Sequence, residues 1–192
     1  MPMSLFVSRR ERHLWIWTLT FVVTIYATMG LTARLAEALS SDDQRAVFFL
    51  LAMFLVAAVV VSEGLTLRPR GAEIGVALGV AAVYLMFFLR LTLAERTHLI
   101  EYGVVAIFIH QALSERATQG RHVPRPALLA VLAAATVGIV DEGIQFFVPS
   151  RVFDPVDILF NVMAATTAVG ACVALRWSKG KVGRRITWPK RK

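Results

Sequence analysis

The sequence predicts an all-α protein, a polytopic transmembrane helical bundle of about six spans with both termini in the cytoplasm. Two observations predict this class. Of the 192 residues, 57% are hydrophobic and 18% are charged, whereas soluble proteins contain about 45–50% apolar and about 25% charged residues. The apolar residues also gather in long runs between short charged segments, and these runs lack the period-two alternation of a transmembrane strand.

Six apolar runs are candidates for crossing a bilayer, which takes about 20 helical residues. The run that opens the chain follows Arg9, Arg10 and Arg12, and its length predicts an uncleaved signal anchor rather than a cleaved signal peptide. The fifth run starts at Pro126, a residue well suited to the first position of a helix. The predicted spans cover approximately residues 14–35, 46–61, 72–89, 97–113, 126–148 and 157–175.

The basic residues predict how the helices are oriented. With six spans, sixteen of the 21 Lys and Arg residues fall on the side that holds both termini, and five fall on the other side. Because Lys and Arg concentrate in cytoplasmic loops, both termini are expected in the cytoplasm. Residues 1–177 then form one transmembrane domain, and residues 178–192 form a basic cytoplasmic tail. This bias and the attraction of the tail to anionic lipids account for the net charge of +8 without a nucleic-acid partner.

Polar side chains recur near the outer end of the last three predicted helices. A charged group within a span costs at least about 2.5–3.5 kcal/mol at mid-membrane, so such groups usually face the interior of a bundle. At about 1.5 Å of rise per residue, these groups lie at similar depth. We therefore expect a polar pocket that opens to the outer face beneath the loop at 149–155. Its candidate residues are His98, Glu101, Tyr102, Glu142, Gln145, Asp157 and Asn161.

A purely structural interpretation of these polar groups stays open. Buried carboxylates and amides can bond to one another, to Arg151, or to the backbone groups that helix ends leave without partners. Asp154, directly before Pro155, fits an N-cap or a turn, and Asp157 fits the positive N-terminal end of a helix. The sequence favours a binding or catalytic site only modestly over this alternative.

Residues 141–161 contain a specific motif: an acidic pair, Gln, an aromatic residue, Pro-Ser-Arg, another aromatic residue, Asp, a second Asp and Asn. It closely resembles the signature of the VanZ-like family, which is named for a membrane protein linked to teicoplanin resistance. Residues 98–103 are similar to an earlier helix of that family, so the resemblance covers about residues 95–170. Ser150 and Ala164 stand where the family usually has Gly. Neither difference removes a polar group from the motif.

The resemblance implies a multi-pass protein of the cell membrane that belongs to the cell envelope and affects glycopeptide sensitivity. The family carries no settled reaction. Our preferred hypothesis is an outer-face pocket that binds or modifies a lipid-linked or glycopeptide-related envelope component. Arg151 would grip a phosphate or carboxylate, and Glu142 or Asp157 would act as a general base. The remaining candidates would bind the ligand: His98, Glu101, Tyr102, Gln145, Asp154 and Asn161.

Two other functions compete with this hypothesis, so whether the protein is an enzyme stays open. One is a non-catalytic membrane helper or scaffold that affects glycopeptide sensitivity, and the other is a small transporter whose acidic residues relay ions. The expected partners are membrane lipids and a lipid-linked envelope precursor. No cofactor is expected, because no known metal-ligand spacing occurs. A divalent cation would find oxygen ligands in Glu101, Glu142, Asp154 and Asp157.

Overall fold

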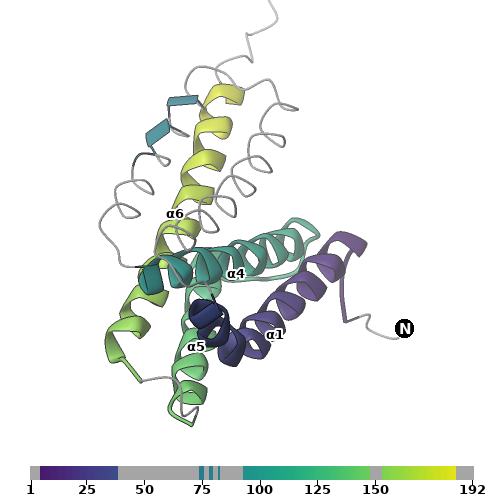
Figure 1. The fold of residues 1–192 in the computed structure, drawn as a ribbon. Coiled ribbons are helices and arrows are strands. Elements are labelled where there is room, and N and C mark those ends of the chain that lie inside the picture. Colours follow the sequence, from purple (N-terminus) through teal and green to yellow (C-terminus); the bar gives the residue numbers. More distant parts are fainter. Residues whose placement is uncertain are drawn as a thin grey trace, which may run out of the picture.

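The computed structural model describes residues 5–38, 74–75, 78–79, 82, 93–147 and 153–184. These residues form four long helices, and no strand occurs among them (Figure 1). The all-α class predicted from the sequence is therefore confirmed for the described part of the chain. The helices are α1 (Arg9–Ala38), α4 (Leu93–Thr118), α5 (Pro126–Gln145) and α6 (Pro155–Arg184).

The described helices contain fewer candidate spans than the sequence predicts. Only α5, over Pro126–Gln145, and α6, over Pro155–Trp177, are long and apolar enough to cross a membrane, against about six predicted spans. The polar residues His98, Glu101 and His110 lower the hydropathy of α4. The side chains of residues 28–38, in the second half of α1, lie outside the described part of the chain. The predicted spans at 46–61 and 72–89 lie outside the described residues, apart from a few helical positions.

Helix α4 is the centre of the described fold. It packs against α1, α5 and α6, whereas α1 barely touches α5 (Figure 1). The second half of α6 extends beyond the other described helices, and Val169 is its last buried residue among the side chains described, which end at Trp177. Small and branched apolar residues fill the core between the four helices: Ile25, Val105, Ala106, Ile109, Ala130, Ala134, Ala165 and Val169.

Helix α5 buries its small and polar residues and exposes its large apolar ones. In a soluble protein an amphipathic helix does the opposite. In lipid, by contrast, small residues let helices pack closely and apolar residues face outward. The pattern of α5 is therefore typical of a helix in a membrane. Its buried residues are Ala130, Ala134, Gly138, Asp141, Glu142 and Gln145, and its exposed apolar residues include Leu128, Leu132, Ile139, Val140 and Ile144.

Helices α5 and α6 approach each other closely at Gly138. A Cβ atom on Gly138 would lie 2.8 Å from both Cβ and Nδ2 of Asn161, a distance that real Cβ atoms do not tolerate. Asn161 is fully buried at this contact. The absence of a side chain at position 138 thus sets how near the two helices can lie.

The start of α1 is tied to the end of α4 by a group that we call the N-terminal clasp: Ser8, Glu11, Glu115 and Arg116. Ser8 Oγ accepts a hydrogen bond from the Glu11 N–H at 3.0 Å, which is an N-cap interaction, and donates one to Glu115 Oε1 at 3.1 Å. Glu11 is fully buried, and its Oε1 lies 3.2 Å from Arg116 Nε. Arg116 also donates to the Leu5 carbonyl at 2.8 Å. The sequence analysis did not predict these contacts.

A tight turn lets α5 follow α4 directly. The Arg121 N–H bonds to the Arg116 carbonyl and the Gly120 N–H to the Ala117 carbonyl, the pair of bonds that defines a Schellman motif. Gly120 has φ 83°, which glycine adopts without steric cost. Pro126 then occupies the start of α5, as the sequence predicts.

The Gly138 contact predicts a strong difference between two glycines of α5. Gly138→Ala should destabilise the fold by about 1–3 kcal/mol, because its methyl group would overlap the Asn161 side chain. Gly143→Ala is the matched control, since nothing lies within 4 Å of a Cβ at that position. The free energy of unfolding in mixed detergent micelles measures both effects. Equal stability of the two variants would contradict the close contact.

The clasp predicts a cost for removing its arginine. Arg116→Ala should lower the free energy of unfolding by about 1–3 kcal/mol, because the buried Glu11 carboxylate loses its charged partner. The exposed Arg12, in the first turn of α1, provides the control, and Arg12→Ala should change stability by less than about 0.5 kcal/mol. The same unfolding measurement applies. If Arg116→Ala left the free energy of unfolding unchanged, the clasp would not hold α1 to α4.

Candidate functional site

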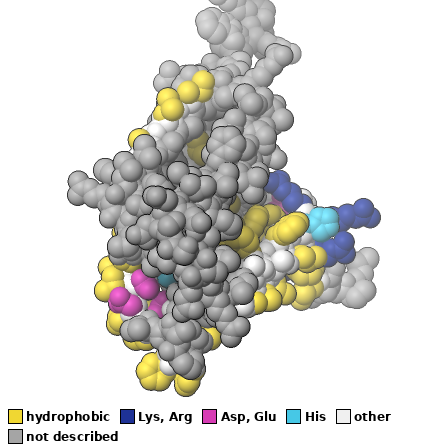
Figure 2. Space-filling model, viewed as in Figure 1, with side chains coloured by type: hydrophobic (Ala, Val, Ile, Leu, Met, Phe, Trp, Pro, Cys, Tyr) yellow, Lys and Arg dark blue, Asp and Glu magenta, His cyan; other side chains and the backbone are white. Residues whose placement is uncertain are grey.

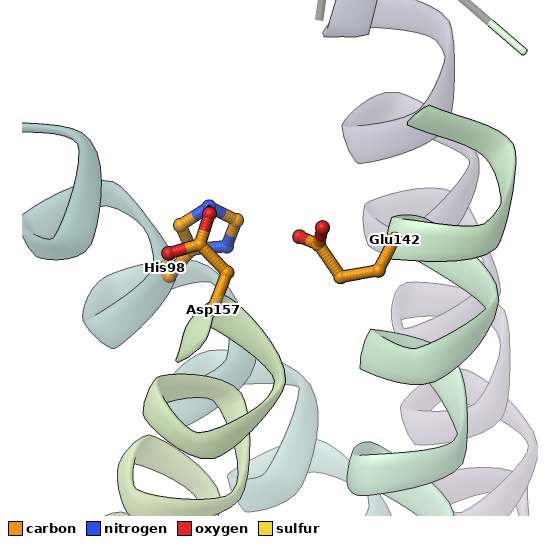
Figure 3. A group of neighbouring side chains, drawn as sticks. All are labelled: His98, Glu142 and Asp157. Atoms are coloured by element: carbon orange, nitrogen blue, oxygen red, sulfur yellow. The ribbon is translucent and has the colours of Figure 1, made fainter. Parts of the chain in front are cut away.

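Three helices bring one polar side chain each to a common point. His98 of α4, Glu142 of α5 and Asp157 of α6 each place a potential ligand atom within 4.8 Å of the other two. His98 Nε2 lies 3.7 Å from Asp157 Oδ2. In Figure 3 the Glu142 carboxylate points across the gap toward the other two side chains. We call these three residues the three-helix cluster.

The imidazole of His98 is held by its neighbour one turn along α4. The rings of His98 and Tyr102 stack with centroids 5.9 Å apart and planes 14° from parallel. Their four-residue spacing puts both on one face of the helix, as the sequence predicts. His98 is 6% exposed and Tyr102 is fully buried. The histidine ring is therefore fixed in a protein interior rather than free in solvent.

The Glu142 carboxylate is oriented by hydrogen bonds to both of its oxygens. Gln145, on the next turn of α5, donates to Oε1 at 3.1 Å, and the Asp154 N–H donates to Oε2 at 3.4 Å. The Gln145 amide also lies 3.4 Å from Asp141 Oδ2. Glu142 is fully buried. These contacts hold a buried carboxylate in one position and aim it at the cluster.

Asp157 gives the cluster its access to the surface. It lies in the first turn of α6, and its side chain is 21% exposed. Asp154 caps the helix just before it, since Asp154 Oδ1 accepts a hydrogen bond from the Val156 N–H at 2.8 Å. Figure 2 shows acidic side chains at the surface beside hydrophobic ones, at the opposite side of the view from the basic residues. The cluster is buried on the side of His98 and Glu142 and open on the side of Asp157.

The structure places the predicted site residues at different distances from the cluster. Tyr102, Gln145 and Asp154 adjoin it through the contacts above. Asn161 lies one turn along α6 from Asp157, and its side-chain amide has no hydrogen-bond partner in the described part of the chain. Glu101 is half-buried and is not one of the three residues that meet.

The position of Glu101 departs from the expected pocket for a simple reason. Successive residues of a helix are rotated by about 100°, so Glu101 lies to one side of the face that carries Tyr102. Arg151, the predicted grip for a phosphate or carboxylate, lies outside the described residues, as does most of the loop expected to cover the pocket.

The sequence analysis did not select two residues that contribute to this region. Asp141 is 2% exposed and contacts the amide of Gln145, and it belongs to the acidic pair of the motif. Tyr26 of α1 donates a hydrogen bond to the Val137 carbonyl of α5 at 2.9 Å. The acidic pair itself was a signal for Asp141, whereas nothing in the sequence connects Tyr26 with α5.

The chemistry of the cluster is set by one imidazole and two carboxylates in a largely water-excluded setting. Burying ionised carboxylates is costly unless a cation or hydrogen-bond donors offset their charge. Such a group can accept and donate protons, because an imidazole and a carboxylate exchange protons readily when they are close. It can also bind a cation, because all three side chains offer lone pairs to one point.

Comparisons with known proteins add no relative to this description. No protein-family model, no curated protein and no solved structure matches the chain. The resemblance to the VanZ-like family therefore rests on the motif residues of the sequence alone.

Proposed function

We propose that this chain is a multi-pass protein of the cell membrane, of the VanZ-like type, with about six spans and both termini in the cytoplasm. The surfaces of α5 and α6 support the proposal. Each helix contains an apolar stretch that is long enough to cross a membrane. Only 28% of that stretch is buried, whereas the core helix of a soluble protein is mostly buried. The strong bias of basic residues to one side supports the orientation.

The length of α4 supports an outer-face position for the three-helix cluster. His98 and Arg116 are near opposite ends of α4, and a rise of 1.5 Å per residue separates them by about 27 Å. This separation is close to the roughly 30 Å thickness of the bilayer core. With the N-terminal clasp at the cytoplasmic face, the cluster then lies near the outer face.

We infer that the three-helix cluster binds or modifies a lipid-linked component of the cell envelope. The observation that carries this proposal is the meeting of His98, Glu142 and Asp157 from three helices, with an opening at Asp157. A pocket near the outer headgroups is accessible to a lipid-linked molecule from both the membrane and the water. The polar side chains of the cluster would contact a hydroxyl or phosphate of that component, directly or through an ion that they hold.

One observation favours the alternative of a non-catalytic helper. Both oxygens of Glu142 already accept hydrogen bonds from the protein, which is also how a purely structural carboxylate is satisfied. In that case the polar residues would hold the fold, and a surface elsewhere would act on glycopeptide sensitivity. The two functions differ in what a conservative substitution does to protein abundance.

Conservative substitutions in the cluster test the proposal in cells. Glu142→Gln and Asp157→Asn keep the size of each side chain and remove its negative charge. Cells that express either variant should be as sensitive to teicoplanin as cells lacking the protein, while the abundance of the variant protein in the membrane stays normal. Immunoblotting of membranes and the inhibitory concentration of teicoplanin provide the two readouts.

The exposed Gly143 lies beside Glu142 on α5, so Gly143→Ala is the matched control and should leave both readouts unchanged. A shift in sensitivity that occurs only in parallel with a loss of abundance would support the helper instead. Unchanged sensitivity in both cluster variants would rule out a role for the cluster.

A further inference from the structure

We propose that the three-helix cluster binds one divalent transition-metal ion of the zinc type through His98, Glu142 and Asp157. This deepens the proposed function and rests on it only for the role of the site, because metal binding is measured without a substrate. The sequence analysis expected no cofactor, since the three residues come from separate helices and form no spacing motif. The cation considered there had only carboxylate ligands, and the structure assigns a different set.

The geometry of the three donors fits a metal of this type. Zinc binds imidazole nitrogen and carboxylate oxygen at about 2.0–2.2 Å, so its tetrahedral ligands lie about 3.3–3.5 Å from one another. His98 Nε2 and Asp157 Oδ2 are 3.7 Å apart, beyond hydrogen-bond distance and close to this spacing. All three donors lie within 4.8 Å of one another. Three protein ligands would leave the fourth position for water or a ligand.

The hydrogen bonding of His98 independently points to a ligand. The side chain is 6% exposed, and Nδ1 has no hydrogen-bond partner in the described part of the chain. Nε2 lies 3.7 Å from Asp157 Oδ2, which is too long for a hydrogen bond between these two atoms. A protonated imidazole would need acceptors for both of its N–H groups. A buried ring that faces two carboxylates without such bonds is better suited to donate a lone pair to a cation (Figure 3).

A divalent cation would also suit the charge of the site. Glu142 is fully buried, and Asp157 is mostly buried beside it. Two ionised carboxylates this close repel each other strongly where water is largely excluded. A divalent ion between them offsets both charges at once.

The surroundings of the ligands resemble the outer shell of a metal site. Side chains that orient the ligands are a regular feature of such sites. Here the Gln145 amide and the Asp154 N–H hold the Glu142 carboxylate, and the Tyr102 ring stacks on His98. These contacts thus position the Glu142 carboxylate and the His98 ring before any ion binds.

The mixed donor set distinguishes among cations. Imidazole suits zinc, copper, iron and nickel, whereas sites for magnesium and calcium consist of oxygen donors. A buried histidine therefore favours Zn²⁺ over Mg²⁺ and Ca²⁺. Because two of its ligands are carboxylates and none is a cysteine, the cluster is a harder ligand set, in the hard–soft sense, than a thiolate site.

Titration of the full-length protein tests the inference. The chain is purified in detergent, stripped with a chelator and titrated with Zn²⁺ by calorimetry, and bound metal is counted by mass spectrometry. We expect one Zn²⁺ per chain with micromolar or tighter affinity, and no competition from excess Mg²⁺. His98→Ala, Glu142→Gln and Asp157→Asn should each weaken binding by more than about tenfold.

Matched controls separate this site from adventitious binding. His13 and His122 are exposed histidines away from the cluster, and their alanine variants should bind Zn²⁺ like the wild type. If Glu142→Gln fails to fold, Asp157→Asn serves in its place, because Asp157 is partly exposed at a helix start. Absence of binding, equal binding in His98→Ala, or loss of binding in His122→Ala would each overturn the inference.

The metal site and the proposed function can fail separately. Specific Zn²⁺ binding together with unchanged teicoplanin sensitivity in the cluster variants would uphold the metal site and reject the proposed function. Altered sensitivity at normal abundance, without Zn²⁺ binding, would reject the metal site alone.

Discussion

The close contact between Gly138 and Asn161 is the constraint on which the polar centre depends. It fixes the separation of α5 and α6, because any side chain at position 138 would overlap the buried amide. One turn further along each helix, toward the loop that joins them, stand Glu142 and Asp157. These carboxylates can meet only if the two backbones come this near. Helix α4, packed against both, then supplies His98 to the same point.

Helix α4 has a polar contact near each end and an apolar middle. At one end its buried histidine enters the three-helix cluster, and at the other Arg116 pairs with the buried Glu11 of α1. Between them Val105, Ala106 and Ile109 pack in the core. Buried charges that pair at the ends of a helix fix its position along its axis, because a slip of one turn would leave them without partners. The same helix thus ties α1 to the bundle and aligns the cluster.

The sequence predicted much of this arrangement where local rules apply. Pro126 opens α5, and one predicted polar residue from each of the last three predicted helices meets the other two: His98, Glu142 and Asp157. The sequence could not predict the rotation of α4, which brings His98 rather than Glu101 into the cluster, because rotation follows from packing against several neighbours. It also missed the clasp, whose Ser8–Glu115 bond joins residues 107 positions apart. The described residues support two of the six predicted spans: polar side chains interrupt α4, and the predicted spans at 46–61 and 72–89 lie almost wholly outside the described residues.

The central claim is that α4 and α6 bring their polar side chains together rather than turning them toward lipid. Cross-linking with a short thiol-reactive reagent tests it directly, in a Cys172→Ser background that has no other cysteine. His98→Cys paired with Asp157→Cys should cross-link rapidly in native membranes. His98→Cys paired with Leu159→Cys should not, because Leu159 is 63% exposed on another face of α6. Equal cross-linking of the two pairs, or cross-linking of the Leu159 pair alone, would contradict the account.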